Sequence, residues 1–126
     1  MSPVFNLRPD EPLRLDSERL ADMFVDLGEA RAEGLIEMSV GRIEELLARL
    51  AIAAEDGRPE TCAGLAREIR AVSDMIGLLS LSWAARGVER AALSRDPVAL
   101  AATRDRLRRM ALRSFRLTEE LRHRSG

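Results

Sequence analysis

Apolar residues recur every three or four positions along most of this chain, and this spacing restricts its fold more than any other feature. The longest such run extends from residue 29 to residue 55, and its stripe consists of Ala32, Leu35, Ile36, Ser39, Ile43, Leu46, Leu50 and Ala53. A repeat of this period places these side chains on one side of an α-helix. No segment alternates apolar and polar residues as a half-buried β-strand would. The pattern therefore predicts an all-α protein.

Glycine, proline and capping residues divide the pattern into separate helices. The breaks are Gly28, then Gly57 with Pro59, then Gly77, and finally Asp96 with Pro97, residue types that end one helix or open the next. We predict four main helices, over residues 29–56, 59–77, 81–94 and 97–121, and a short helix from Asp16 or Ser17 to Gly28. Because short links make neighbouring helices antiparallel, we expect an antiparallel up-down four-helix bundle with a short extra N-terminal helix.

The length of 126 residues is enough for one domain with a single core. We expect an extended, proline-containing arm over residues 1–15, the bundle over residues 16–122 and a frayed tail over residues 123–126. The predicted core residues are Ile43, Leu50, Leu65, Ile69, Val72, Val88, Leu107 and Leu117.

The composition is typical of a folded globular protein. Hydrophobic residues make up 46% and charged residues 33% of the chain, which is unlike a disordered protein. No apolar run approaches the length of a membrane span, and no signal-peptide pattern opens the chain. We therefore expect no membrane partner and a cytoplasmic location. The helix expected over residues 59–77 has its own apolar stripe, which consists of Leu65, Ile69, Val72 and Ile76. The one cysteine, Cys62, lies on this stripe, and we expect it to be a small core residue.

Charge is distributed unevenly along the chain. Residues 1–60 contain 14 acids and 7 arginines, whereas residues 61–126 contain 7 acids and 13 arginines. Much of the basic excess lies in RDRLRRMALRSFR, residues 104–116. Such a run can bind nucleic acid or an acidic protein, but it is more often a solvated helix face. Because Phe115 is its only aromatic residue, the sequence does not favour a nucleic-acid partner.

The helix expected over residues 59–77 has a face that combines charged and small residues. These residues are Arg67, Arg70, Ala71 and Asp74, preceded one turn earlier by Ala63 and Gly64. Small side chains leave space for another molecule, and arginine binds carboxylate or phosphate oxygens. This face is therefore a candidate partner-binding surface. The alternative is a solvated face whose local Arg–Asp pairs contribute roughly a few tenths of a kcal/mol.

The segment AREIRAVSDMIG, residues 66–77, resembles the signature of histidine-containing phosphotransfer (HPt) domains. In that family an A-H-x-L-K-G segment is followed by a glycine ten positions after the histidine. The matching residues here are Ala66, Ile69, Arg70, Ala71 and Gly77, and in the next helix Leu81, Ala84, Ala85 and Glu89. The resemblance implies an HPt-like bundle in a two-component phosphorelay, with a response-regulator receiver domain or a histidine kinase as its partner.

Arg67 stands where that family has its phosphoacceptor histidine. Phosphoryl transfer needs a neutral imidazole nitrogen with a free lone pair, whereas a guanidinium stays protonated and has no acceptor atom. The resemblance therefore implies a pseudo-HPt protein that is not an enzyme and has no catalytic residue, cofactor or metal. The docking surface that it implies consists of Ala63, Gly64, Arg67, Arg70, Ala71 and Asp74. Arg67 would reach a partner's acidic pocket or its phosphorylated aspartate.

A second function remains open, namely a structural or dimerisation bundle in which this face is idle, as a monomer or a homodimer. His123 is the only histidine and lies in the expected tail, where histidine is commonly a helix C-terminal cation. We do not favour it as a phosphoacceptor. Cys62 and His123 lack the spacing of a metal site. Trp83 is either an interface anchor or a core residue, and we predict core packing.

Overall fold

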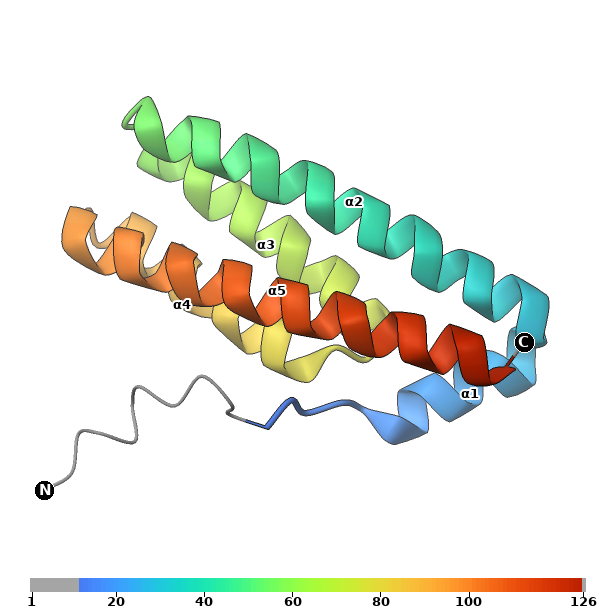
Figure 1. The fold of residues 1–126 in the computed structure, drawn as a ribbon. Helices are drawn as coiled ribbons and strands as arrows, with labels where there is room; N and C mark the ends of the chain where they lie inside the picture. Colours follow the sequence, from blue (N-terminus) through green and yellow to red (C-terminus); the bar gives the residue numbers. More distant parts are fainter. Residues whose placement is uncertain (1–11, 126) are drawn as a thin grey trace, which may run out of the picture.

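The computed structural model describes residues 12–125, apart from the side chains of residues 122–125. Within this range the elements are α1 (Ser17–Leu27), α2 (Glu29–Glu55), α3 (Pro59–Met75), α4 (Leu79–Leu93) and α5 (Pro97–Ser125) (Figure 1). No β-strand forms between residues 12 and 125. The only β-type pairing in this range is an isolated antiparallel bridge between Leu15 and Leu78. The prediction of an all-α protein is confirmed.

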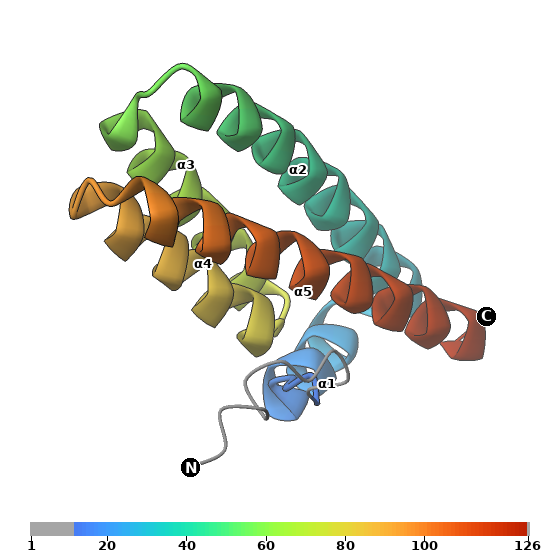
Figure 2. The same ribbon diagram turned by 60° about the vertical axis from the view of Figure 1, so that its left-hand side comes forward.

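The four long helices form an up-down bundle in which each helix packs beside the next one in the chain. The turn between α2 and α3 and the turn between α4 and α5 lie at one end of the bundle, and α1 lies at the opposite end (Figure 1). Figure 2 shows the same arrangement from a second direction. The short α1 packs against α2. The predicted antiparallel architecture with an additional N-terminal helix is therefore confirmed.

Most helix ends lie within two residues of their predicted positions. The link between α3 and α4 lies two residues before its predicted position, since α3 ends at Met75 and α4 begins at Leu79. The larger difference is at the C-terminus, where α5 continues to Ser125. The backbone expected to fray from residue 123 onward is therefore helical as far as residue 125.

Aspartate side chains cap two of the helices, as the sequence suggests. Oδ1 of Asp16 accepts a hydrogen bond from the backbone N–H of Arg19 at 3.0 Å. Oδ1 of Asp96 accepts from the backbone N–H groups of Val98 and Ala99, both at 3.1 Å. These N–H groups have no partner inside the first helical turn, so the carboxylates stabilise the starts of α1 and α5.

The core contains most of the residues predicted for it. Those buried are Ile43, Leu50, Leu65, Ile69, Val88 and Leu107. Val72 and Leu117 are only partly buried, so their assignment to the core proper is wrong. The next residue in each helix, Ser73 and Thr118, is buried instead. Each of these hydroxyls donates a hydrogen bond to a carbonyl of the preceding turn, which removes the cost of burying an unpaired polar group.

The prediction that Trp83 packs in the core is wrong, because its side chain is 48% exposed. The apolar core side of α4 includes Leu81, Ala84, Ala85, Val88 and Ala92. Its alanines let α4 pack closely against α3 and α5, and a close-packed interior of this kind leaves no space for an indole. Trp83 therefore lies on the outer side of α4.

The residues before α1 pair with the link between α3 and α4. The backbone N–H of Asp16 donates to the carbonyl of Gly77 at 2.8 Å, and that of Ser80 donates to the carbonyl of Arg14 at 3.3 Å. The N–H of Arg14 in turn donates to Oγ of Ser80 at 2.8 Å. The last residues of the predicted N-terminal arm are thus fixed to the bundle, while residues 1–11 lie outside the part that the structure describes.

This pairing makes Gly77 sensitive to substitution. Its φ is +73°, and an added Cβ would lie 3.1 Å from the carbonyl oxygen of Asp16. We expect Gly77→Ala to lower the free energy of unfolding by about 2 kcal/mol, because a left-handed backbone strains an L-residue and the Cβ crowds the backbone of Asp16, with which Gly77 pairs. Urea unfolding checks this value. The control is Gly34→Ala in α2, where a Cβ meets open space and helix propensity gains about 1 kcal/mol. Shifts of the same sign in both variants would contradict the argument.

Candidate functional site

The outer side of α3 presents five of the six residues that the sequence assigned to a partner-binding surface. The exposed or partly exposed members are Gly64, Arg67, Arg70, Ala71 and Asp74, and we call them the α3 face. The sixth, Ala63, is 1% exposed and packs in the core. It follows the buried Cys62 and lies one turn before the buried Ala66, so the helix turns its methyl group inward. Ala63 is therefore a packing residue and lies outside the exposed face.

Glu89 of α4 joins the two arginines of the α3 face. Its Oε2 accepts a hydrogen bond from Nη1 of Arg67 at 3.0 Å, and its Oε1 lies 3.1 Å from Nη1 of Arg70. The side chain of Glu89 is only 15% exposed, compared with 51% for Arg67 and 30% for Arg70. A carboxylate so far removed from water needs partners, and each oxygen has one. The site is therefore a bridged cluster of two guanidiniums and one carboxylate.

Sequence reasoning gave Glu89 no functional role, because the cluster depends on how α3 and α4 align. Arg67 and Glu89 are 22 positions apart and meet only because the two helices pack antiparallel in one particular register. A weak signal was present in the sequence. Glu89 is the only acid in α4, where the other charged residues are Arg86 and Arg90.

Gly64 provides space for the Arg67 side chain. A Cβ added to Gly64 would lie 3.9 Å from Nη2 of Arg67, so a larger side chain there would compete with the guanidinium. The sequence suggested that small residues on this helix leave clearance for a partner. Part of that clearance is taken by Arg67 itself, whose guanidinium extends from Gly64 toward Glu89.

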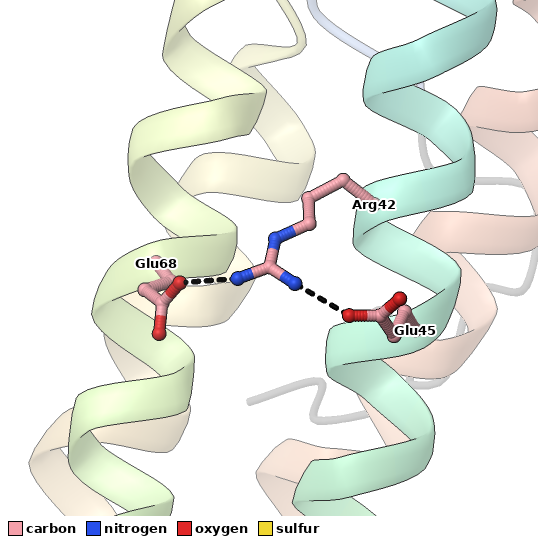
Figure 3. Close-up of polar contacts among 3 residues, drawn as sticks. All are labelled: Arg42, Glu45 and Glu68. Carbon is pink, nitrogen blue, oxygen red and sulfur yellow. Dashed lines mark hydrogen bonds and ion pairs between the residues drawn. The ribbon is translucent and has the colours of Figure 1, made fainter.

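A second ion-pair cluster flanks the α3 face on the side of α2. Arg42 of α2 lies between Glu45 and Glu68 (Figure 3). Its Nη2 donates to Oε2 of Glu68 in α3 at 2.9 Å, and its Nη1 pairs with Glu45 within α2. All three side chains are well exposed, so each pair contributes at most about 1 kcal/mol. This cluster connects α2 to α3 and offsets the charge of Arg42.

Among the side chains that the structure describes, the other candidate groups show no arrangement for chemistry. Cys62 is buried, as predicted, and burial raises the pKa of its thiol, partly offset by the positive charge of Arg104. A thiol with a raised pKa is a poor nucleophile. Between residues 12 and 125, no group of three or more His, Cys, Asp or Glu residues is placed to hold a metal ion. No helix in this range has the length and apolar character needed to cross a membrane.

The basic run of α5 behaves as a solvated helix face where its side chains are described. Arg108 and Arg109 lie 3.9 Å and 3.5 Å from the carboxylate of Asp105, and all three side chains are well exposed. These are local contacts within one helix, and such pairs contribute little to stability.

The arginines of the α3 face have donors suited to oxyanions, but as protonated guanidiniums they offer no lone pair to accept a phosphoryl group. A guanidinium has five N–H donors and no acceptor lone pair. The contacts to Glu89 use Nη1 of Arg67 and Nη1 of Arg70, which leaves further donors on both side chains. Such donors bind carboxylate or phosphate oxygens, often two at a time.

Comparison with known proteins gives a match in structure and none in sequence. No protein-family model matches the chain, and no match was found among curated proteins. The fold is similar to the crystal structure of histidine-containing phosphotransfer protein B (HptB) from Pseudomonas aeruginosa PAO1, with a TM-score of 0.82 and 22% identity over 88% of this chain and 96% of that chain. At this identity the likeness concerns the fold. The HPt-like bundle predicted from the sequence is confirmed.

Proposed function

We propose that this chain is a non-catalytic HPt-like signalling protein of a bacterial two-component phosphorelay, acting in the cytoplasm. It docks a receiver domain or a histidine kinase through the α3 face and accepts no phosphate. One observation carries the proposal: the fold is similar to that of an HPt protein, and in the segment that resembles the HPt signature an arginine, Arg67, stands where the signature has its histidine. The fold and the residues of the signature support docking. The missing lone pair at position 67 supports the absence of transfer.

The chemistry of the α3 face suits an acidic partner surface. Arg67 is half exposed and Arg70 partly exposed, and both keep donors that the contacts to Glu89 do not use. Ala71 has only a methyl group and Gly64 has no side chain, so a partner's backbone can approach the helix closely where Arg67 does not fill the space beside Gly64. Carboxylates in a receiver pocket would meet charge-assisted donors, which are stronger than neutral ones.

A second function is supported by the same cluster. Glu89 already forms ion pairs with Arg67 and Arg70. The charges of the two arginines therefore need no partner molecule, as expected for a surface that binds nothing. The chain would then be a structural or dimerisation bundle, as a monomer or a homodimer. This alternative expects no receiver or kinase to depend on the two arginines.

The test compares binding with and without the two arginines. Removing them alone would leave the partly buried Glu89 unpaired, at a cost of about 1 kcal/mol or more. We would therefore compare Glu89→Gln with the triple variant Arg67→Ala, Arg70→Ala, Glu89→Gln. Receiver domains and histidine kinases encoded in the same genome are purified and titrated singly by calorimetry.

We expect a partner that binds the Glu89→Gln protein to bind the triple variant at least about tenfold more weakly. Each lost charge-assisted hydrogen bond costs about 1.5–3 kcal/mol, and about 1.4 kcal/mol corresponds to a factor of ten. Circular dichroism and thermal unfolding serve as controls for the fold. Equal affinity of the two variants, with the fold unchanged, would favour the idle bundle.

A further inference from the structure

The outer side of α4 carries an exposed stripe that the proposed function has not used. It consists of Trp83, Arg86, Arg90 and Leu93, spaced by three, four and three positions, and we call it the α4 stripe. This spacing places all four on one side of the helix. Trp83 is 48% and Leu93 56% exposed, and both arginines are exposed as well. The stripe thus presents apolar groups at its two ends and two cations between them.

The arginines of the α4 stripe differ from those of the α3 face in their partners. Within the part of the chain that the structure describes, neither Arg86 nor Arg90 makes an ion pair, whereas Arg67 and Arg70 share Glu89. The α4 stripe therefore has two uncompensated positive charges, which attract an acidic surface over a distance of up to about 10 Å at ordinary salt.

The two surfaces are continuous with each other. Glu89 lies between Arg86 and Arg90 in the sequence of α4 and contacts Arg67 and Arg70 across the boundary with α3. A partner that covers the α3 face would therefore border the α4 stripe. To bind Arg67 or Arg70, its carboxylates must share a guanidinium with Glu89 or displace it, and this competition offsets part of the gain. Arg86 and Arg90 impose no such competition.

We propose that the α4 stripe supplies most of the binding free energy for the receiver partner, with Trp83 as the anchor. This inference rests on the proposed function and names the part of the surface that dominates it. The partner has an apolar depression for the indole and carboxylates beside it for Arg86 and Arg90. Tryptophan and arginine are the residue types that most often dominate protein interfaces, and unpaired charges raise the association rate.

The experiment measures affinity and association rate for each receiver domain of the same genome, with and without phosphorylation, by surface plasmon resonance. The first variant is Trp83→Ala, and the second combines Arg86→Ala with Arg90→Ala. The third is the triple variant of the α3 face defined above, which is compared with Glu89→Gln alone. Matched controls lie on α5. Val98→Ala removes another exposed apolar side chain, and Arg108→Ala with Arg109→Ala removes two exposed cations.

We expect Trp83→Ala to weaken binding at least about thirtyfold and to change thermal unfolding little, because the indole is 48% exposed and is not part of the core. The Arg86, Arg90 double variant is expected to weaken binding about tenfold, mainly through slower association, and to flatten its dependence on salt. The triple variant is expected to lose less than Trp83→Ala does. The α5 controls are expected to bind as the wild type does.

Other outcomes would overturn the inference. If a receiver binds and only the α3-face variant loses affinity, the α4 stripe is not the main surface and the proposed function stands. If no receiver binds the wild-type chain, the α4 stripe does not serve a receiver, and the receiver part of the proposed function fails with it. If sedimentation shows a dimer that Trp83→Ala dissociates, the stripe is an interface between copies of this chain.

Discussion

Wild-type protein mixed with a phosphorylated receiver domain, or with a histidine kinase and ATP, is expected to take up no acid-labile phosphoryl group. A phosphoryl group on a receiver aspartate is transferred to a neutral nitrogen that offers a lone pair. Arg67 has none, because a guanidinium stays protonated and its nitrogens are donors only. Its Nη1 also pairs with Glu89 at 3.0 Å. The expected effect is all or none, and phosphate-affinity gel electrophoresis with radiolabel measures it.

The control for this prediction must show that the partner is active, so an HPt protein known to accept phosphate from the same receiver is tested in parallel. Label on His123, the only histidine of the chain, would contradict the prediction. Arg67→His alone is not expected to reach the rate of that HPt protein, since Ala71 and Arg70 stand where the family has glycine and lysine. Any label on the histidine introduced at position 67 would nevertheless be evidence that a receiver docks there.

Ile69→Ala is expected to lower the free energy of unfolding by about 3 kcal/mol, the largest loss of stability among the variants described. Ile69 is 0% exposed at the centre of the bundle, and truncation of a fully buried isoleucine costs about 2–5 kcal/mol through lost burial and the cavity left behind. Urea unfolding followed by circular dichroism gives the value, and the slope of the transition shows whether it remains two-state.

Val72→Ala is the matched control, three positions along the same helix. The sequence assigns both residues to one buried stripe, but Val72 is only partly buried and packs at the edge of the core. We expect a loss of about 1 kcal/mol, because less apolar surface leaves water when this side chain packs. Losses of equal size at the two positions would mean that Val72 is as much a core residue as Ile69.

Local chemistry explains why the helices and their ends could be predicted from the sequence. An apolar repeat of three and four positions needs no knowledge of the fold to indicate a helix. The carboxylates of Asp16 and Asp96 act on N–H groups two or three residues away. The departures are small and also local, since α5 runs to Ser125 where we expected fraying.

The candidate site was predictable only in part. Periodicity places Arg67, Ala71 and Asp74 on the outside of α3, and the structure agrees. The inward position of Ala63 was missed, because a small apolar residue fits either a core or a surface and only the neighbouring helices decide between them. Trp83 was misplaced for a different reason. A large apolar residue in an amphipathic helix usually packs inward, and the sequence does not show how little space the neighbouring helices leave for it.

The sequence by itself determined the all-α class, the four long helices, their antiparallel order and the arginine at position 67, because each depends on residues close together in the chain. The tertiary structure alone decided what surrounds that arginine. The alignment of α3 with α4 brings Glu89 to Arg67 and Arg70, and the close packing of alanines on α4 turns Trp83 outward. These relations depend on the register and distance between helices, which no local pattern encodes.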